Sequence, residues 1–215
     1  MAGHTQGGVT LQRRFHYEQA FEHYLRAKAI PYVAVDEARR ALTGKAGGPL
    51  KADAVGPKGS ASSLKNFDFV VYSENGPNLL IDVKGRKLPA SKVGKSGKTA
   101  TSAFQNWVTA DDVDHMAKWQ GLFGDGFIAA FAFLFWCDAP PPDALFQEVF
   151  EYDGKWYAIL AITLENYRQH MRPRSVKWET VNIPSKMFRD LSQPLEKMLK
   201  NETTLGPSQT GLFPE

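Results

Sequence analysis

Residues 66–84 read NFDFVVYSENGPNLLIDVK, and this stretch decides the fold. Aromatic and β-branched residues dominate Phe67–Tyr72, and aliphatic residues dominate Leu79–Val83, which predicts two strands. The segment between them, Glu-Asn-Gly-Pro-Asn at 74–78, is rich in turn-forming residues. The two strands are therefore expected to pair as a β-hairpin.

Three charged residues interrupt these apolar strands: Asp68, Asp82 and Lys84. Asp82 and Lys84 are two residues apart, so their side chains share one face of the strand while Val83 faces the core. Pairing in a hairpin brings Asp68, near the start of its own strand, beside Asp82. Burying charge is costly unless the charges are paired or bind a metal.

Two adjacent carboxylates and the backbone carbonyl of Val83 are the hard oxygen ligands that Mg²⁺ prefers, and Mn²⁺ is a possible substitute. A metal-bound water has a lowered pKa and can attack a phosphodiester. The ammonium group of Lys84 is suited to orient that water or to offset charge in the transition state. The alternative is structural: an ion pair between Asp82 and Lys84, with Asp68 capping a strand end.

The elements around this hairpin are predicted from hydrophobic period and from caps. Arg14–Ala29 has apolar residues at a helical period, and Pro31 ends that pattern. Tyr32–Val35 is a short strand. Thr109 is a plausible N-cap for a helix that runs to Phe123, and Phe127–Trp136 is apolar enough to be a buried central strand.

The segment after Trp136 carries no recognised motif. It is expected to form a hairpin around Asp153-Gly154, then a helix, a strand and a last helix. The ranges are, in that order, Phe146–Tyr152 with Lys155–Ile162, Leu164–Met171, Val176–Ile183 and Ser185–Leu199.

This order of elements predicts an α/β fold with a mixed sheet covered by helices. Residues 1–13 are expected to be a flexible N-terminus and residues 201–215 a disordered tail. The domain between them, residues 14–200, divides into a core of 14–136 and a C-terminal extension of 137–200.

The acid at Asp68, followed on a paired strand by Asp82-Val83-Lys84 and preceded by a helix, resembles the PD-(D/E)XK nucleases. Within that superfamily the pattern is most similar to the Holliday junction resolvase-like and RecB-like nucleases. The sequence departs from the motif at Phe67, where the motif has proline. The resemblance implies a restriction-endonuclease-like three-layer core with a central mixed β-sheet flanked by helices. It further implies a Mg²⁺-dependent DNA endonuclease, often a homodimer, in repair, recombination or replication.

The resemblance also assigns roles to individual residues. Asp68 and Asp82 would bind the metal and Lys84 would position the nucleophile. Many members add a glutamate from the first helix, for which Glu18 is the first choice and Glu22, one turn away on the same face, the second. Some members add a glutamine from the following helix, and Gln120 is the local candidate.

Gly85–Thr101 is predicted to be a loop, and its basic residues would hold the phosphates of DNA against the metal. These residues are Arg86, Lys87, Lys92, Lys95 and Lys98, with no acid between Lys84 and Lys98. Without the adjacent acids, such a run would be interpreted as a solvated loop. A second basic group, Arg172, Arg174 and Lys177, is expected to be a solvated face.

The predicted tail contains Gln209, Leu212 and Phe213 in the order Gln-x-x-Leu-Phe. This pattern resembles the one by which bacterial replication and repair proteins dock on the sliding clamp. In that interpretation the two apolar side chains fill a pocket and the glutamine adds a hydrogen bond. The alternative, in which the tail packs back on its own domain, is equally open.

Composition narrows the remaining classes. The 215 residues carry a formal net charge of +3, which permits a nucleic-acid partner. The single cysteine, Cys137, excludes an internal disulfide and suits a reducing compartment. There is no apolar run of about 18 residues, and Met1–Thr10 lacks the order of a secretory signal, so a cytoplasmic protein without membrane contact is expected.

Two rival functions remain at this point. A catalytically inactive nucleic-acid-binding or scaffold protein could keep the same fold, although all three polar positions of the motif are present here. The second rival is an unrelated α/β protein in which these charged residues have only a structural role.

Overall fold

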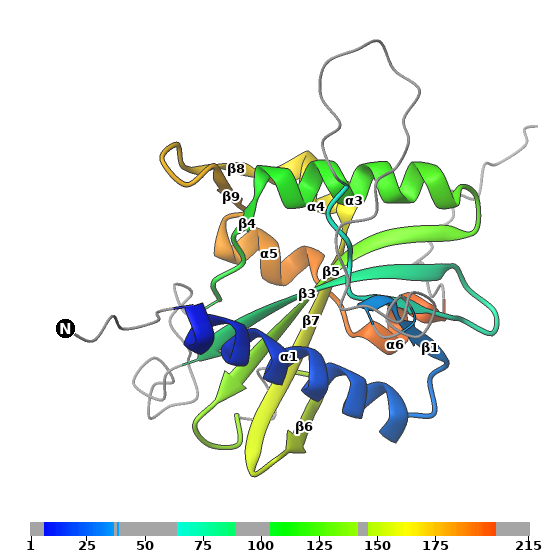
Figure 1. The fold of residues 1–215 in the computed structure, drawn as a ribbon, viewed down its shortest axis with the longest axis vertical. Helices are drawn as coiled ribbons and strands as arrows, with labels where there is room; N and C mark the ends of the chain where they lie inside the picture. Colours follow the sequence, from blue (N-terminus) through cyan, green and yellow to red (C-terminus); the bar gives the residue numbers. More distant parts are fainter. Residues whose placement is uncertain (1–6, 37, 39–63, 89–103, 142–145, 201–215) are drawn as a thin grey trace, which may run out of the picture.

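The middle layer of the molecule is a six-stranded mixed sheet in the order β1-β2-β3-β5-β7-β6 (Figure 1). The computed structural model describes residues 7–36, 38, 64–88, 104–141 and 146–200. Only β3 and β5 run parallel to each other; all other neighbours are antiparallel. In chain order the strands are β1 (Tyr32–Ala34), β2 (Phe69–Val71), β3 (Asn78–Leu88), β5 (Phe127–Cys137), β6 (Val149–Tyr152) and β7 (Lys155–Thr163).

Helices cover both faces of this sheet, which confirms the predicted three-layer α/β architecture. On one face α1 (Gly7–Ala27) and α6 (Leu195–Leu199) pack on a core that includes Phe21, Ile81 and Leu134. On the other face α3 (Ala110–Phe123), α4 (Leu164–His170) and α5 (Ser185–Leu191) pack on a second core. Strands buried on both faces explain the almost continuous apolar run of β5.

The predicted hairpin is confirmed, and its register places Phe69 opposite Ile81 and Val71 opposite Leu79. The predicted loop is wrong at its start, because β3 does not end at Val83 but continues to Leu88. Along its whole length β3 pairs with β5, so the long apolar strand supplies backbone partners for Gly85–Leu88. Backbone hydrogen bonding with a central strand outweighs the polar composition that suggested a loop.

A second, three-stranded sheet has the order β4-β9-β8 and lies at the end of α3 where that helix begins (Figure 1). Its strands are β4 (Val108–Thr109), β8 (Arg172–Ser175) and β9 (Thr180–Asn182). The single strand predicted over Val176–Ile183 is therefore wrong, since residues 176–179 form the turn of a hairpin. The exposed residues of β8, which include Pro173, gave no hydrophobic alternation to detect.

Two helices also differ from their predicted bounds. The first helix begins at Gly7 rather than at Arg14. The last predicted helix is two helices, α5 and α6, because Pro194 lacks an N–H group and restricts the residue before it. In the gap Gln193 pairs with Ala161 of β7 instead.

The predicted cap of α3 and the predicted hairpin turn are confirmed. Thr109 caps α3 through a capping box, in which its side chain accepts from the backbone of Asp112 and Asp112 accepts from the backbone of Thr109. Asp153 and Gly154 have φ values of 50° and 66°, as a tight hairpin turn requires. Among the described residues, no helix has the length and apolar character needed to span a membrane.

Gly85 lies where α1 and β3 pack closely against each other. A Cβ atom at this position would collide with the ring of Tyr17 on α1. Gly85→Ala is therefore expected to lower the free energy of unfolding by about 1–3 kcal/mol, the usual cost of overpacking. The measurement is urea denaturation followed by circular dichroism.

Gly121→Ala is the matched control, because a Cβ on this α3 glycine meets nothing within 4 Å. Alanine favours helix over glycine, so this variant should gain up to about 1 kcal/mol. Equal changes in the two variants would show that the contact between Tyr17 and Gly85 does not limit packing.

Candidate active site

Asp82 and Lys84 lie side by side on β3, as their spacing predicts. Lys84 Nζ lies 2.7 Å from Asp82 Oδ2, and Asp82 is 4% exposed. On the neighbouring strand β5 their backbone partners are Phe131 and Phe133. The charged pair is thus enclosed by apolar strand residues, where water screens it poorly.

Asp68 lies immediately before β2 and is tied to the same point of β3. Its Oδ2 accepts a hydrogen bond of 2.7 Å from Val83 N, and its own N–H donates to Ile81 O at 3.0 Å. Burial raises the pKa of Asp68 well above its ordinary value, and the negative charges of Asp82 and Glu18 raise it further. The negative charges of Asp82 and Glu18 therefore both act on the carboxyl of Asp68.

The first helix supplies Glu18, the first of the two glutamates considered. Glu18 is half-buried, and its charge acts on Asp68, which places it on the side of α1 that faces the acids. Glu22 instead accepts hydrogen bonds from Arg26 at 2.5 Å and from Tyr32 at 2.6 Å. Glu18 therefore lies within electrostatic range of Asp68, whereas Glu22 is engaged by Arg26 and Tyr32.

Asp112, in the first turn of α3, is a site residue that the sequence analysis missed. Its Oδ2 lies 3.0 Å from Lys84 Nζ, and its Oδ1 pairs with the ammonium of Lys65. The helix start was recognised, but the sequence analysis did not distinguish this aspartate from Asp111 and Asp114. The spacing from Thr109 to Asp112 is the signal that could have done so, because a capping box directs that side chain back toward the helix start.

Lys84 is thus held between two carboxylates from different elements. Burial alone would lower the pKa of Lys84, but Asp82 and Asp112 outweigh burial, so the pKa is raised. Burial would likewise raise the pKa of Asp112, but Lys84 and Lys65 hold it below its ordinary value. Asp112 and Lys84 therefore both remain charged at neutral pH.

Arg86 extends the basic side of the site, although it lies on β3 and not in a loop. Its guanidinium donates to Gly85 O at 2.7 Å and to Trp107 O, and stacks on the Trp107 ring at 4.3 Å. Burial lowers the pKa of Arg86 to about 10. In the part of the chain that the structure describes, Arg86 has no carboxylate within ion-pair distance, and its buried Nε has no hydrogen-bond partner.

The other predicted phosphate contacts have different outcomes. Lys87 is exposed, pairs with Asp138 at 3.0 Å and lies over the ring of Trp136 at 4.6 Å. Several remaining predictions lie outside the described residues: Lys92, Lys95 and Lys98 of the basic segment, and Gln209, Leu212 and Phe213 of the tail.

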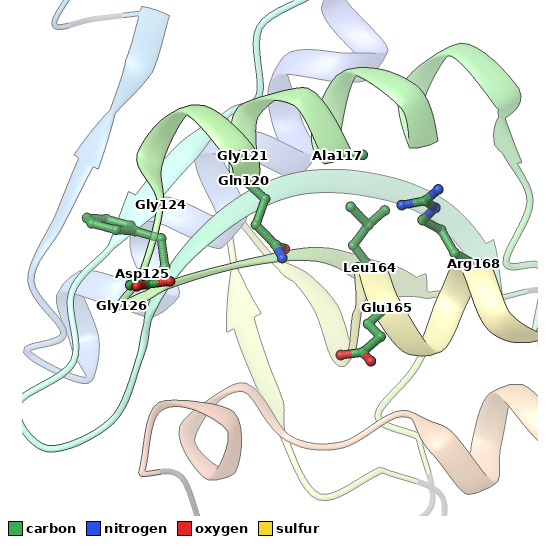
Figure 2. Close-up of a pocket in the computed structure, with 10 residues that line it drawn as sticks. Ala117, Gln120, Gly121, Gly124, Asp125, Gly126, Leu164, Glu165 and Arg168 are labelled. Carbon is green, nitrogen blue, oxygen red and sulfur yellow. The ribbon is translucent and has the colours of Figure 1, made fainter.

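Gln120 is not brought to the acidic cluster. It reaches from α3 toward β5, where its Oε1 accepts from Ala129 N at 2.8 Å (Figure 2). It also lines a pocket of about 650 Å³ at the end of α3 opposite Asp112, together with Asp125, Glu165 and Arg168. The structure thus gives Gln120 a role in joining α3 to the sheet.

The donor set at the cluster suits a hard divalent cation. Mutual repulsion of Asp68, Asp82 and Glu18 is relieved by positive charge, and carboxylate oxygen is the ligand that Mg²⁺ prefers. Within the described ranges, no group of three or more His, Cys, Asp and Glu side chains is already gathered closely enough to hold a metal. Two carboxylates and a backbone oxygen, with water as the other ligands, remain sufficient for Mg²⁺.

Comparison with known proteins gives one likeness. No family model and no curated protein matches the chain. Among solved structures, the chain is similar to Hjc, a Holliday junction resolvase from the archaeal hyperthermophile Archaeoglobus fulgidus, with 13% sequence identity and a TM-score of 0.45. The match covers 86% of this chain and 98% of that chain.

Repulsion among the acids has a consequence for stability. Folding raises the pKa of Asp68 above its ordinary 3.8. The contribution of this carboxyl to the free energy of unfolding is therefore fully present below pH 3.8 and is lost as the pH rises through the folded pKa. Asp68→Asn removes the loss and can keep the hydrogen bond from Val83. In EDTA at pH 7 the variant should unfold about 2–4 °C higher than the wild type, the shift that about 1 kcal/mol produces in a domain of this size.

The gain should shrink as the pH is lowered toward 3.8 and below, because Asp68 is then protonated in the folded state and increasingly protonated in the unfolded state as well. Asp125→Asn, at an exposed position near the end of α3, is the matched control and should leave the midpoint unchanged. A lower midpoint for Asp68→Asn at pH 7 would mean that the ionised carboxylate stabilises the metal-free fold.

Proposed function

We propose that the protein is a metal-dependent DNA endonuclease that hydrolyses phosphodiester bonds. The observation that carries the proposal is the convergence of Asp68, Asp82 and Lys84 at one point of the sheet. Buried acids that repel each other beside a buried ammonium are expensive to maintain, and such arrangements occur preferentially at functional sites.

Asp68, Asp82 and the carbonyl of Val83 would hold Mg²⁺ or Mn²⁺, with Glu18 assisting directly or through water. When bound, such an ion supplies a water of lowered pKa and polarises the phosphate oxygen. The chain itself supplies the geometry, because β3 carries Asp82 and Lys84 on one face and the backbone of Val83 fixes Asp68. These groups are set by strands, which hold a catalytic arrangement more precisely than loops.

Lys84 would donate hydrogen bonds to the attacking water or to the phosphate in the transition state. Asp112 acts as a positioning residue, since it shares the ammonium with Asp82 and keeps the lysine protonated. When substrate enters, Asp112 can retain Lys84 in place while Asp82 turns its second oxygen to other partners.

Arg86 would bind a phosphate next to the scissile one. Its guanidinium retains donors that no carboxylate of the described ranges occupies, and phosphate is the counter-ion whose geometry suits it. Lys87, on the following position of β3, would add a weaker and more solvated contact. The remaining basic residues, Lys92, Lys95 and Lys98, stay predictions for DNA binding.

One observation favours a second candidate, a non-catalytic DNA-binding protein with the same fold. Lys84 pairs directly with Asp82, and in the described chain no three-carboxylate group is preassembled. The two candidates differ in one outcome, which is cleavage. A place in repair, recombination or replication, a homodimer, clamp docking through the tail and a cytoplasmic location also stay predictions.

Cleavage is tested with linear, flapped and four-way branched DNA, in Mg²⁺, in Mn²⁺ and in EDTA. We expect metal-dependent cleavage. Its rate should fall at least about 100-fold in Asp82→Asn and in Lys84→Met, because each variant lacks a group that would stabilise the transition state. Asp125→Asn should cleave as the wild type does. Binding of DNA by the wild type without cleavage in any metal would favour the second candidate, and neither binding nor cleavage would exclude both.

The positioning role of Asp112 has its own test. Asp112→Asn should lower kcat about 10-fold with little change in KM, because Lys84 loses one of its two carboxylates. Loss of that charge lowers the pKa of Lys84, so the alkaline limb of the pH–rate profile should move to lower pH. Asp112→Glu, which retains the charge, should restore the limb in part. An unchanged pH profile would contradict the positioning role and leave Asp112 with only its structural role in the capping box of α3.

A further inference from the structure

The hairpin formed by β8 and β9 carries an unusual set of exposed side chains. Trp178 is 69% exposed and Val176 is 90% exposed, both in the turn at 176–179. The basic residues Arg172, Arg174 and Lys177 are exposed beside them, and Glu179 is the one acid between residues 172 and 182. An exposed tryptophan at a hairpin tip buries little of its own surface, so packing within this chain does not explain it.

This hairpin is attached rigidly to the helix that bears Asp112. Thr180 of β9 pairs with Thr109 of β4, which is the N-cap of α3. The next residue, Ala110, donates its N–H to Glu179 O at 2.8 Å. Backbone hydrogen bonds therefore fix the base of the hairpin three residues from Asp112, and the tip projects beyond the start of α3 (Figure 1).

A row of basic and aromatic groups connects the hairpin to the acidic cluster. Arg174 lies over the ring of Trp107 at 5.3 Å, and Arg86 lies over the same ring at 4.3 Å. Arg86 is two residues from Lys84 on β3, so the two side chains share one face of the sheet. The row thus begins at the proposed scissile phosphate and ends at the hairpin, and its charge is complementary to a nucleic-acid backbone.

We propose that the β8–β9 hairpin is a DNA-binding arm of this enzyme. Arg172, Arg174 and Lys177 contact phosphates that flank the scissile position, and Trp178 stacks on an unpaired base at the tip. The proposal rests on the proposed function and adds to it a preference for DNA in which an unpaired nucleotide lies beside a duplex. Stacking on an aromatic side chain requires a base that is not already stacked on both sides.

The test measures binding by the full chain in EDTA, so that cleavage does not interfere. The two ligands are a labelled flapped duplex and a blunt duplex of the same length, each titrated over a range of salt concentrations. The charge variant is Arg172→Ala/Arg174→Ala/Lys177→Ala, and the stacking variant is Trp178→Ala. The matched control, Lys28→Ala/Lys197→Ala/Lys200→Ala, removes the same formal charge near α6 on the other face of the sheet.

The charge variant should bind both ligands more weakly and should flatten the plot of log affinity against log salt by about 2–3, because each lost phosphate contact removes about 0.9 from the slope. The control should keep the wild-type slope. Trp178→Ala should weaken binding of the flapped ligand about 10-fold and that of the blunt duplex much less.

The outcomes separate this proposal from the proposed function. If the wild type binds DNA and the hairpin variants bind it equally well, or if the control loses as much as the charge variant, the arm is overturned and the nuclease proposal stands. Equal losses for the two ligands in Trp178→Ala overturn the stacking contact. If the wild type binds neither ligand and cleaves no DNA, both proposals fail.

Discussion

The buried ammonium of Lys84 depends on carboxylates from two separate parts of the fold. Asp82 comes from its own strand and Asp112 from the first turn of α3, and the distances to Nζ are 2.7 Å and 3.0 Å. Removing the charge from water is costly, and each acid offsets part of that cost. The same contact ties α3 to β3, so the geometry of the site and the packing of one helix layer on the sheet depend on each other.

Much of the core could be predicted because its signals are local. The apolar strands and turn residues of 66–84 predicted the hairpin, the apolar run of Phe127–Trp136 predicted β5, and Thr109 predicted the start of α3. The failures were non-local. Gly85–Leu88 are in a strand only because β5 lies beside them, and the polar strand β8 is paired through β9 to β4. The local composition of a segment does not reveal a strand partner that is distant in the sequence.

In the candidate site, too, local signals could be predicted and non-local contacts could not. Asp68, Asp82 and Lys84 were predicted because a charge inside an apolar strand is conspicuous in the sequence. Asp112 was not: its spacing from Thr109 could have marked it as part of a capping box, but its contact with Lys84 comes from tertiary packing. Proximity to Asp68 likewise distinguishes Glu18 from Glu22, although both lie on one face of α1 and the sequence ranks them almost equally.

The second sheet connects the proposed DNA-binding hairpin to the helix start that holds Lys84. Strand β4 ends at Thr109, which caps α3, and the capping box fixes Asp112, which holds Lys84. Because β9 pairs with β4, a force on the hairpin is transmitted through backbone hydrogen bonds to the helix start. Hydrogen-bonded strands deform less than a loop, so DNA held by the hairpin would also be held at a fixed distance from Lys84. A binding arm on a flexible linker would raise the affinity for DNA, but it would not select which phosphate meets the acids.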